Sequence, residues 1–298
     1  MAKLGFLYTI GLLLMSLTVL SLVLIISQVE KKSNEQVSDL SRYERAYNLD
    51  SSINNAFTEV FKTASGISIS HGNYTKKNQT LRIRETLPNS NSTIFFQNMT
   101  SLSWYLNKTS NLASDNVTIS LNNLANIKSN LPLQIMPYNI SYEHISYFGS
   151  NTIKFTPKRF NFYGYNITII TPIDPSATLQ PFSIAAGDRT MAAYIKIKGP
   201  LVTRKLADTH VPPAGLSSLD VKDSGGINSL ALISIDNTVL TITNPRPTNK
   251  LTVSVEVILW KNLTRITQVY YPGKLYNVTL PDFGIKTESN VMIASFPA

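Results

Sequence analysis

The stretch GFLYTIGLLLMSLTVLSLVLIIS, residues 5–27, decides how this chain begins. No charged residue lies between Leu4 and Val29. At about 1.5 Å per residue, a helix of this length exceeds the roughly 30 Å hydrocarbon layer of a bilayer. The apolar run is longer than a signal-peptide core and no A-x-A cleavage site follows it, which favours a retained signal anchor over a removed signal peptide. We therefore expect residues 1–29 to be a transmembrane anchor.

The charges that flank this anchor do not orient it. Lys3 lies on one side and Lys31 and Lys32 on the other, so the positive-inside rule favours neither direction. N-glycosylation acceptors supply the direction, because all of them lie beyond the anchor. There are ten: Asn73, Asn78, Asn91, Asn98, Asn107, Asn116, Asn139, Asn166, Asn262 and Asn277. They predict a single-pass protein of the cell membrane with a glycosylated, extracytoplasmic C-terminal region.

Composition indicates the nature of the region beyond the anchor. Of 298 residues, 43% are hydrophobic and only 15% are charged, which is below the quarter usual in soluble domains. Asn, Ser and Thr take the polar positions, a composition that suits β-rich extracellular domains. The absence of cysteine excludes a disulfide framework, thiolate metal ligands and thiol nucleophiles, and it favours a prokaryotic surface protein.

Residues 30–63 continue the helical pattern without proline or glycine. Apolar side chains form two stripes at helical spacing, which are Leu40, Tyr43 and Tyr47, and then Ile53, Phe57, Val60 and Phe61. At 100° per residue the stripes do not coincide, so we expect a break near residues 48–52, with Asp50 or Ser51 capping a second helix. The prediction is an amphipathic helical stalk over 30–63 whose second stripe packs against the head.

After Gly66 the pattern changes from helix to strands and turns. A short helix is expected over 99–113, with Leu102, Tyr105 and Leu106 facing inward. Three prolines in TPIDPSATLQPF, residues 171–182, predict a linker. Short β-branched or alternating runs predict strands at 67–70, 80–84, 117–121, 138–148, 152–156 and 160–171. We therefore expect a β-rich, α+β head domain over 64–175.

The clearest strand lies in the C-terminal part, over 176–298. In LTVSVEVILW, residues 251–260, apolar residues alternate with Thr252, Ser254 and Glu256. MAAYIKIKG, residues 191–199, places its lysines on one face. Two hairpins are predicted, one turning at Asp236–Asn237 and one around Pro272–Gly273. Strands at this spacing predict an antiparallel β-sandwich, immunoglobulin-like, as a second head domain.

The net charge of +9 is concentrated in the middle of the chain, since residues 64–212 hold fourteen basic and six acidic side chains. Such a region can attract anionic polymers or lipid headgroups, or it can simply keep the chain soluble. Arg82 and Arg84 share one face of a predicted strand. Lys158 and Arg159 stand beside aromatic residues in PKRFNFYGY, residues 157–165. These four residues are the candidates for contact with an anionic polymer.

Nucleic acid is a less favoured partner for this region. Basic residues beside aromatic ones can bind it through backbone attraction and base stacking. Strand alternation that buries Phe160 and Phe162 explains the same pattern without a ligand. Strand alternation is the favoured explanation, so nucleic acid is disfavoured, and an anionic surface polymer is the candidate partner of the basic region.

Catalytic and metal-binding patterns are weak. His71, His144 and His210 match no metal-ligand spacing, and no HExxH, P-loop or GxSxG motif occurs. Asp220 and Asp223 in the glycine-rich DVKDSGG could hold Ca²⁺ or form a polar surface turn, and the turn is favoured. We expect no metal, no cofactor and no enzymatic activity.

The order of these segments resembles the layout of type IV pilin-like proteins of archaea. The basic start Lys3-Leu4-Gly5-Phe6 leads into an apolar helix, an amphipathic extension and a β-rich head. More widely, the KxGFLYTI-type start resembles that of archaeal membrane-anchored surface proteins. The pilin resemblance implies cleavage between Gly5 and Phe6 and a filament core formed by residues 6–27.

Three functions are consistent with these features of the sequence. The first is a structural surface protein or filament subunit that associates with copies of itself through the N-terminal helix. The second is an anchored adhesin or receptor whose basic head holds an anionic polymer or glycan. The third, an anchored enzyme, is supported only by the size of the head.

Overall fold

The computed structural model describes residues 2–75, 78–89, 91–112, 118–121, 130–147, 149–157, 162–176, 191–211, 216–246, 248–259, 266–272, 276–280, 285–289 and 292–297. In α1 it describes side chains from Met15 onward, except at positions 42, 45 and 46. The chain forms two compact units, Met1–Ser51 and Ser52–Ala298. We call the second unit the head.

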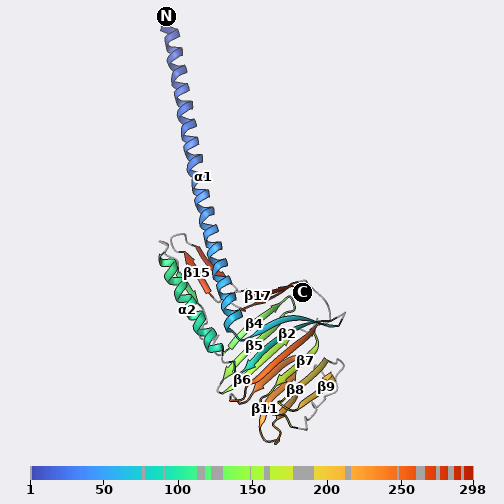
Figure 1. The fold of residues 1–298 in the computed structure, drawn as a ribbon. Helices are drawn as coiled ribbons and strands as arrows, with labels where there is room; N and C mark the ends of the chain where they lie inside the picture. The colour runs from blue at the N-terminus through green and yellow to red at the C-terminus, as the bar shows by residue number, and fades with distance from the viewer. Residues whose placement is uncertain are drawn as a thin grey trace. The chain divides into compact units, whose positions relative to one another are not determined.

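Helix α1 runs from Ala2 to Ala64 without interruption (Figure 1). It contains no proline, and its glycines, Gly5 and Gly11, both lie near its start. Between Met15 and Val29 its large apolar side chains are 51–68% exposed. Within the residues whose side chains are described, no helical stretch combines the length and the apolar character that crossing a bilayer requires.

The described part of the head contains one further helix and three β-sheets. The helix is α2 (Asn91–Leu112). The strands are β1 (Ser68–Thr75), β2 (Asn78–Leu87), β3 (Thr118–Leu121), β4 (Asn130–Met136), β5 (Ile140–Tyr147), β6 (Ser150–Pro157), β7 (Phe162–Ile170), β8 (Met191–Lys198), β9 (Thr203–Val211), β10 (Leu216–Lys222), β11 (Ser229–Asp236), β12 (Val239–Asn244), β13 (Leu251–Leu259), β14 (Ile266–Tyr270), β15 (Tyr276–Leu280), β16 (Ile285–Ser289) and β17 (Met292–Pro297).

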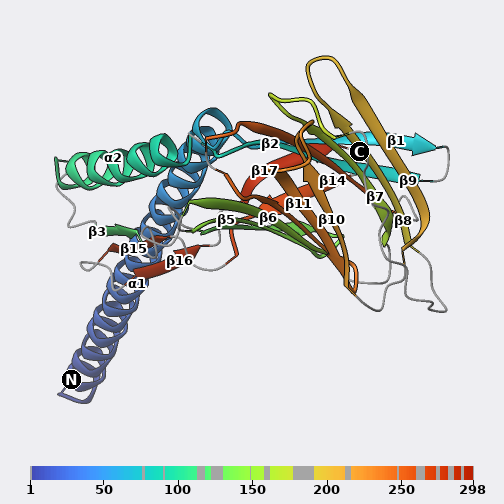
Figure 2. The same ribbon diagram turned by 90° about the horizontal axis from the view of Figure 1, so that it is seen from below.

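Two large sheets form the body of the head. The six-stranded sheet has the order β1-β2-β13-β7-β8-β9, and the eight-stranded sheet has the order β10-β11-β12-β6-β5-β4-β14-β17. Figure 2 shows β5 and β6 in a different layer from β2. A small third sheet, β16-β15-β3, completes the described strands. The head is therefore β-rich and consistent with a β-sandwich.

The core lies between the two large sheets. Alternate residues of β13 are fully buried, as its sequence pattern predicts, and the intervening Thr252, Ser254 and Glu256 are partly exposed. Phe155 of β6 and Tyr165 of β7 bring their ring centroids to 6.5 Å across the layers. The Tyr165 hydroxyl donates to the carbonyl of Thr238 at 2.6 Å, which satisfies its polar group inside the core.

The last turns of α1 belong to this core. Ile53, Phe57 and Phe61 are at most 4% exposed, and Phe61 meets Phe95 of α2 edge to face at 5.9 Å. The Thr58 hydroxyl donates to the carbonyl of Met292 at 2.8 Å, which connects the helix to β17. The expected packing of the second helical stripe against the head is confirmed.

The predicted break near residues 48–52 is wrong, because α1 is continuous there. The two stripes have different surroundings, so they do not need to lie on the same face of the helix. Leu40, Tyr43 and Tyr47 are 65–74% exposed, whereas Ile53, Phe57 and Phe61 of the second stripe are buried and Val60 is partly exposed. One continuous helix can carry both stripes, so no capping at Asp50 or Ser51 is needed.

The predicted boundary between head domains at 175/176 does not divide the structure. Residues 52–298 form one compact unit. In the six-stranded sheet β13 pairs with β2 and β7, and in the eight-stranded sheet β12 pairs with β6. Strands from both sides of the predicted boundary thus share each sheet. The predicted linker contributes Pro175, which bridges to Asp223; residues 177–182 lie outside the described ranges.

Three further details differ from the sequence-based predictions. The sandwich is neither confined to 176–298 nor wholly antiparallel, since β7 and β8 run parallel. The hairpin around residues 272–273 is wrong, because β14 pairs with β4 and β17 while β15 pairs with β3 and β16. Helix α2 starts earlier than predicted and buries Phe95 and Met99, whereas Tyr105 is 59% exposed.

Candidate functional site

The outward side of the six-stranded sheet collects basic and hydroxyl side chains. We call it the cationic face. Strand pairing aligns its central row across all six strands, which consists of Ser68, Arg84, Ser254, Thr168, Lys196 and Lys205. The row on one side is Thr86, Thr252, Ile170, Lys198 and Thr203, and the row on the other is Ser70, Arg82, Glu256, Asn166, Tyr194 and Ala207.

The charge on these three rows is strongly positive. They hold five cations, namely Arg82, Arg84, Lys196, Lys198 and Lys205, and one carboxylate, Glu256, which gives 5 − 1 = +4. Arginine and lysine side chains point outward because the alternate positions of each strand are apolar and buried, as Ile83, Ile195 and Ile197 are. The face is therefore a consequence of strand alternation combined with sheet order.

Arg82 and Arg84 lie on the same strand but have different partners. The Arg82 guanidinium forms an ion pair with Glu256 of β13, in which its Nε donates to Oε1 at 2.7 Å. The other carboxylate oxygen of Glu256 accepts from Asn166 Nδ2 at 2.7 Å. Arg84 has no carboxylate within ion-pair distance among the described residues. Its charge is thus open to a ligand, while that of Arg82 is balanced.

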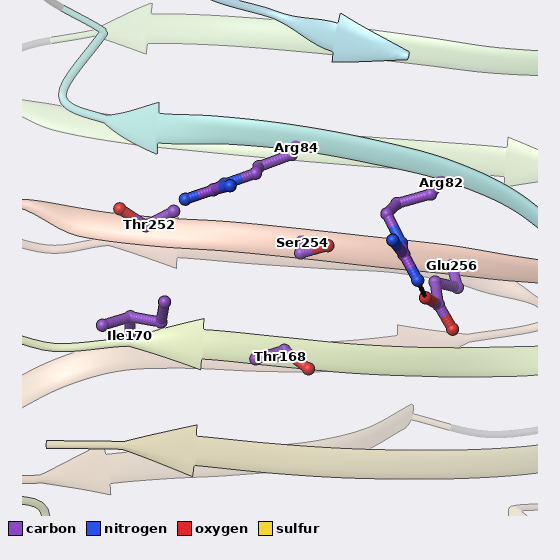
Figure 3. A pocket seen from close by; sticks show the side chains of 7 residues that line it. All are labelled: Arg82, Arg84, Thr168, Ile170, Thr252, Ser254 and Glu256. Atoms are coloured by element: carbon purple, nitrogen blue, oxygen red, sulfur yellow. Dashed lines mark hydrogen bonds and ion pairs between the residues drawn. The ribbon is translucent and has the colours of Figure 1, made fainter. Parts of the chain in front are cut away.

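A cavity of about 250 Å³ opens beside Arg84. Figure 3 shows Arg84 extending from β2 toward Thr252 of β13, while Arg82 turns to Glu256. Ser254 and Thr168 lie between Arg84 and the Arg82–Glu256 pair, and Ile170 also lines the cavity. Arg82 and Glu256, which are paired with each other, also line the cavity, so it offers one uncompensated guanidinium and three hydroxyl groups. This set of donors suits an oxyanion that also carries hydroxyls.

A buried polar network lies on the inner side of the same strand. Glu85 accepts from Asn89 Nδ2 at 2.7 Å and from the Tyr142 hydroxyl, and His144 Nδ1 lies 2.8 Å from its Oε1 but out of line for a hydrogen bond. Burial, reinforced by the Glu85 carboxylate, raises the pKa of Tyr142 well above its ordinary value. Tyr142 therefore stays protonated and donates to Glu85.

Ser146 extends this network in an order that resembles a hydrolytic triad. Its Oγ lies 3.0 Å from His144 Nε2, and His144 in turn contacts Glu85. The Ser146 hydroxyl, however, donates to Asn151 Oδ1 at 2.8 Å, so its proton is directed away from the imidazole. Glu85 is 2% and His144 3% exposed. Glu85 and His144 thus link the two sheets through polar contacts in their core, while the partly exposed Ser146 directs its proton to Asn151.

Comparison with known proteins finds no matching family model, curated protein or solved structure. The geometry of the chain itself is therefore the basis for any functional conclusion. Among the described residues, no group of three metal-ligating side chains comes together. Arg82 and Arg84 do share one face, as predicted, while Lys158 and Arg159 lie outside the described residues.

The three lysines of the cationic face were not among the predicted contact residues. The alternation in residues 191–199 does place Lys196 and Lys198 on one face, as expected. The pattern could not supply the sheet order, which places β8 beside β7 and β9 beside β8 and thereby adds three cations to the two arginines. In the sequence, the one indication of this surface was the spacing of Lys196 and Lys198, two residues apart in an alternating run.

The glycosylation acceptors differ in their surroundings. Asn98 is exposed on α2, and Asn139 lies in the β4–β5 turn with a φ of 53°. Asn166 already donates its amide to Glu256, and Asn277 has a buried Oδ1 in β15. The side chains of the other six acceptors lie outside the described ones, as do those of Gly5 and Phe6 at the predicted cleavage point.

Asp220 and Asp223, the two carboxylates that could hold Ca²⁺ or form a polar turn, are both engaged in hydrogen bonds within the loop. Asp223 accepts from Asn228 Nδ2 at 2.6 Å and from the backbone N–H groups of Ile227 and Asn228. The Asn228 side chain, helped by these N–H groups, lowers the pKa of Asp223 below its ordinary value. Asp220 accepts from the Ser229 hydroxyl at 2.6 Å. Both carboxylates thus close a polar turn between β10 and β11.

Proposed function

We propose that the protein is a single-pass, N-glycosylated cell-surface protein with a structural role, held in the membrane by its N-terminal helix. The observation that supports this proposal is α1. One continuous helix contains both the uncharged segment from Leu4 to Val29 and the stripe at Ile53, Phe57 and Phe61 that the head buries. A helix of this composition suits a bilayer at one end and a protein core at the other.

The filament version of this proposal rests on a second feature of α1. Val37, Leu40, Tyr43 and Tyr47 are 63–74% exposed, although their side chains are apolar or aromatic. Copies of the chain packed along α1 would remove such groups from water, which is favourable by about 25 cal/mol per Å² of apolar surface. This arrangement agrees with the resemblance to archaeal type IV pilin-like proteins and with cleavage between Gly5 and Phe6.

The mature N-terminus, measured by mass spectrometry, tests which version holds. Cleavage after Gly5, together with recovery of the protein in sheared filaments, is the expected result for a filament subunit. A Gly5→Val variant should remain uncleaved and stay in the membrane fraction. An intact N-terminus with the protein confined to membranes would reject the filament version, and recovery of the uncleaved chain from the soluble fraction would reject anchoring.

A second function has its own observation, which is the cationic face. An anchored adhesin or receptor needs an exposed surface that selects a ligand, and five cations against one carboxylate select for negative charge. The sandwich fold does not choose between the two functions, because such folds, immunoglobulin-like ones included, serve adhesion, structure and catalysis alike. Since Glu85 and His144 are buried and the Ser146 hydroxyl donates its proton to Asn151, we propose a non-catalytic role.

A further inference from the structure

We infer that the cationic face binds an acidic polysaccharide, in which the cavity beside Arg84 takes a sugar carboxylate and the lysines of β8 and β9 take neighbouring charges. This inference rests on the second function proposed above and specifies its ligand. It places the charged contacts on three strands, β2, β8 and β9, that no local sequence pattern connects.

Arg84 is the first element of the site. The guanidinium presents donors in a planar fork that fits a carboxylate, and the described residues provide no carboxylate for it. Thr252, Ser254 and Thr168 surround the cavity with hydroxyl groups that both donate and accept. A uronic acid carries a carboxylate beside its ring hydroxyls, so it uses both kinds of group at once.

The lysines are the second element. Lys196 of β8 lies directly opposite Lys205 of β9, and Lys198 lies two residues further along β8. Like charges in directly opposite positions destabilise a sheet. Among the described residues, no carboxylate lies within ion-pair distance of these lysines. A bound polyanion would supply the missing negative charge, as it would for Arg84.

The spacing of the cations favours an extended chain that crosses the strands. Neighbouring strands lie about 4.8 Å apart, so three strand intervals separate Arg84 from Lys196 by roughly 14 Å at the backbone. Ser254 and Thr168 occupy the two positions between them in the central row. A polysaccharide lying along this row would alternate between charged and hydroxyl contacts, as its own substituents do.

Two other polyanions fit this face less well. Non-specific binding of single-stranded nucleic acid uses aromatic platforms for base stacking, and Tyr194 is the one aromatic residue in the three rows. A bilayer surface is held by basic residues together with inserted apolar groups, and Ile170 is the one large aliphatic side chain there, 41% exposed. The hydroxyl content of the face therefore favours sugar.

The test uses the full chain in a nanodisc of zwitterionic lipid and measures its binding to polygalacturonate. Dextran serves as the neutral polysaccharide, oligo(dT) as nucleic acid, and vesicles with anionic lipid as a membrane surface. Arg84→Gln and the pair Lys196→Gln with Lys205→Gln remove cations from the face. Lys222→Gln removes an exposed cation from β10 of the other sheet and is the matched control.

Polygalacturonate should bind, and more weakly as salt rises, while dextran should not. Arg84→Gln should weaken binding roughly tenfold, the value of one charge-assisted hydrogen bond, and Lys222→Gln less than twofold. Equal losses from Arg84→Gln and Lys222→Gln, tighter binding of oligo(dT) or anionic vesicles, or no polyuronate binding would overturn the inference. None of these results bears on anchoring, which the N-terminus and cell fractionation test separately.

Discussion

Lys196 and Lys205 face each other across the β8–β9 pair, directly opposite and on the outward side of the sheet. The buried Ile195 and Ile197 stabilise the inner side of β8. The lysine pair opposes this stabilisation, since like charges at directly opposite positions cost up to about 1 kcal/mol. The lysine pair therefore lowers the stability of the free protein. A substitution at Lys196 can change stability and ligand binding in opposite directions, which separates the two effects.

Replacing Lys196 with Glu should stabilise the free protein by about 0.2–1 kcal/mol, because it turns a repulsive pair into an attractive one. The same change should weaken polyuronate binding. Urea unfolding of the full chain in detergent measures the first effect. Lys154→Glu is the mirror-image control, since Lys154 lies opposite Glu143 and the change creates a repulsive pair. A stability gain without loss of binding would contradict the role of Lys196 in the face.

Glu85→Leu should destabilise the head by several kcal/mol. The change leaves the Tyr142 hydroxyl without its acceptor inside the core and removes one of the two acceptors of the Asn89 amide, which keeps the Ser65 carbonyl. Each unsatisfied buried donor costs about 1–3 kcal/mol. Denaturant unfolding gives the value. Glu143→Leu, a change of the same kind on the outward side of β5, should shift stability by no more than about 0.5 kcal/mol. Similar losses for the two variants would show that the network contributes little.

The head should lose stability in alkali. Burial raises the pKa of Tyr142 and of Tyr165 well above the ordinary value near 10. Below that value both states are protonated and stability is complete, whereas above it the unfolded chain releases protons that the folded one retains, so stability falls as pH rises. Tyr165→Phe should reduce this fall, as measured by urea midpoints between about pH 8 and 11. An unchanged slope in the variant would contradict the assignment.

Glycan occupancy should depend on the surroundings of the acceptor amides. Asn98 and Asn139 should carry glycans, because one is exposed on α2 and the other lies in a turn. Asn166 should not, since its amide is engaged with Glu256 in the middle of β7. Glycopeptide mass spectrometry of the protein from its native source checks all three sites. A glycan at Asn166 would mean that modification precedes formation of the six-stranded sheet.

Several features of the head were predictable from local patterns. The alternation in 251–260 correctly identified β13 and its buried positions, and the run from Ile53 to Phe61 identified the helical stripe that enters the core. The turn at Asn237 was also recognisable, because asparagine tolerates the positive φ of 46° found there. These features depend on residues close together in the chain, where side-chain periodicity and backbone preference act directly.

Other features depended on which strands become neighbours. The parallel pairing of β7 with β8, the sharing of both sheets across the predicted domain boundary, and the separation of β14 from β15 all come from long-range pairing. No local pattern distinguishes one edge partner from another, because the same alternation suits any of them. The predicted hairpin and second domain failed for this reason.

The amino-acid sequence was sufficient for the uncharged N-terminal segment, the helical stripes and the alternation of the main strands, since each is a periodic property of neighbouring residues. The candidate site needed the tertiary structure. Arg84 and Lys205 are far apart in the chain and share a surface only because β13, β7 and β8 lie between their strands. Sheet order, which the burial of the whole core determines, therefore decided where positive charge gathers on this protein.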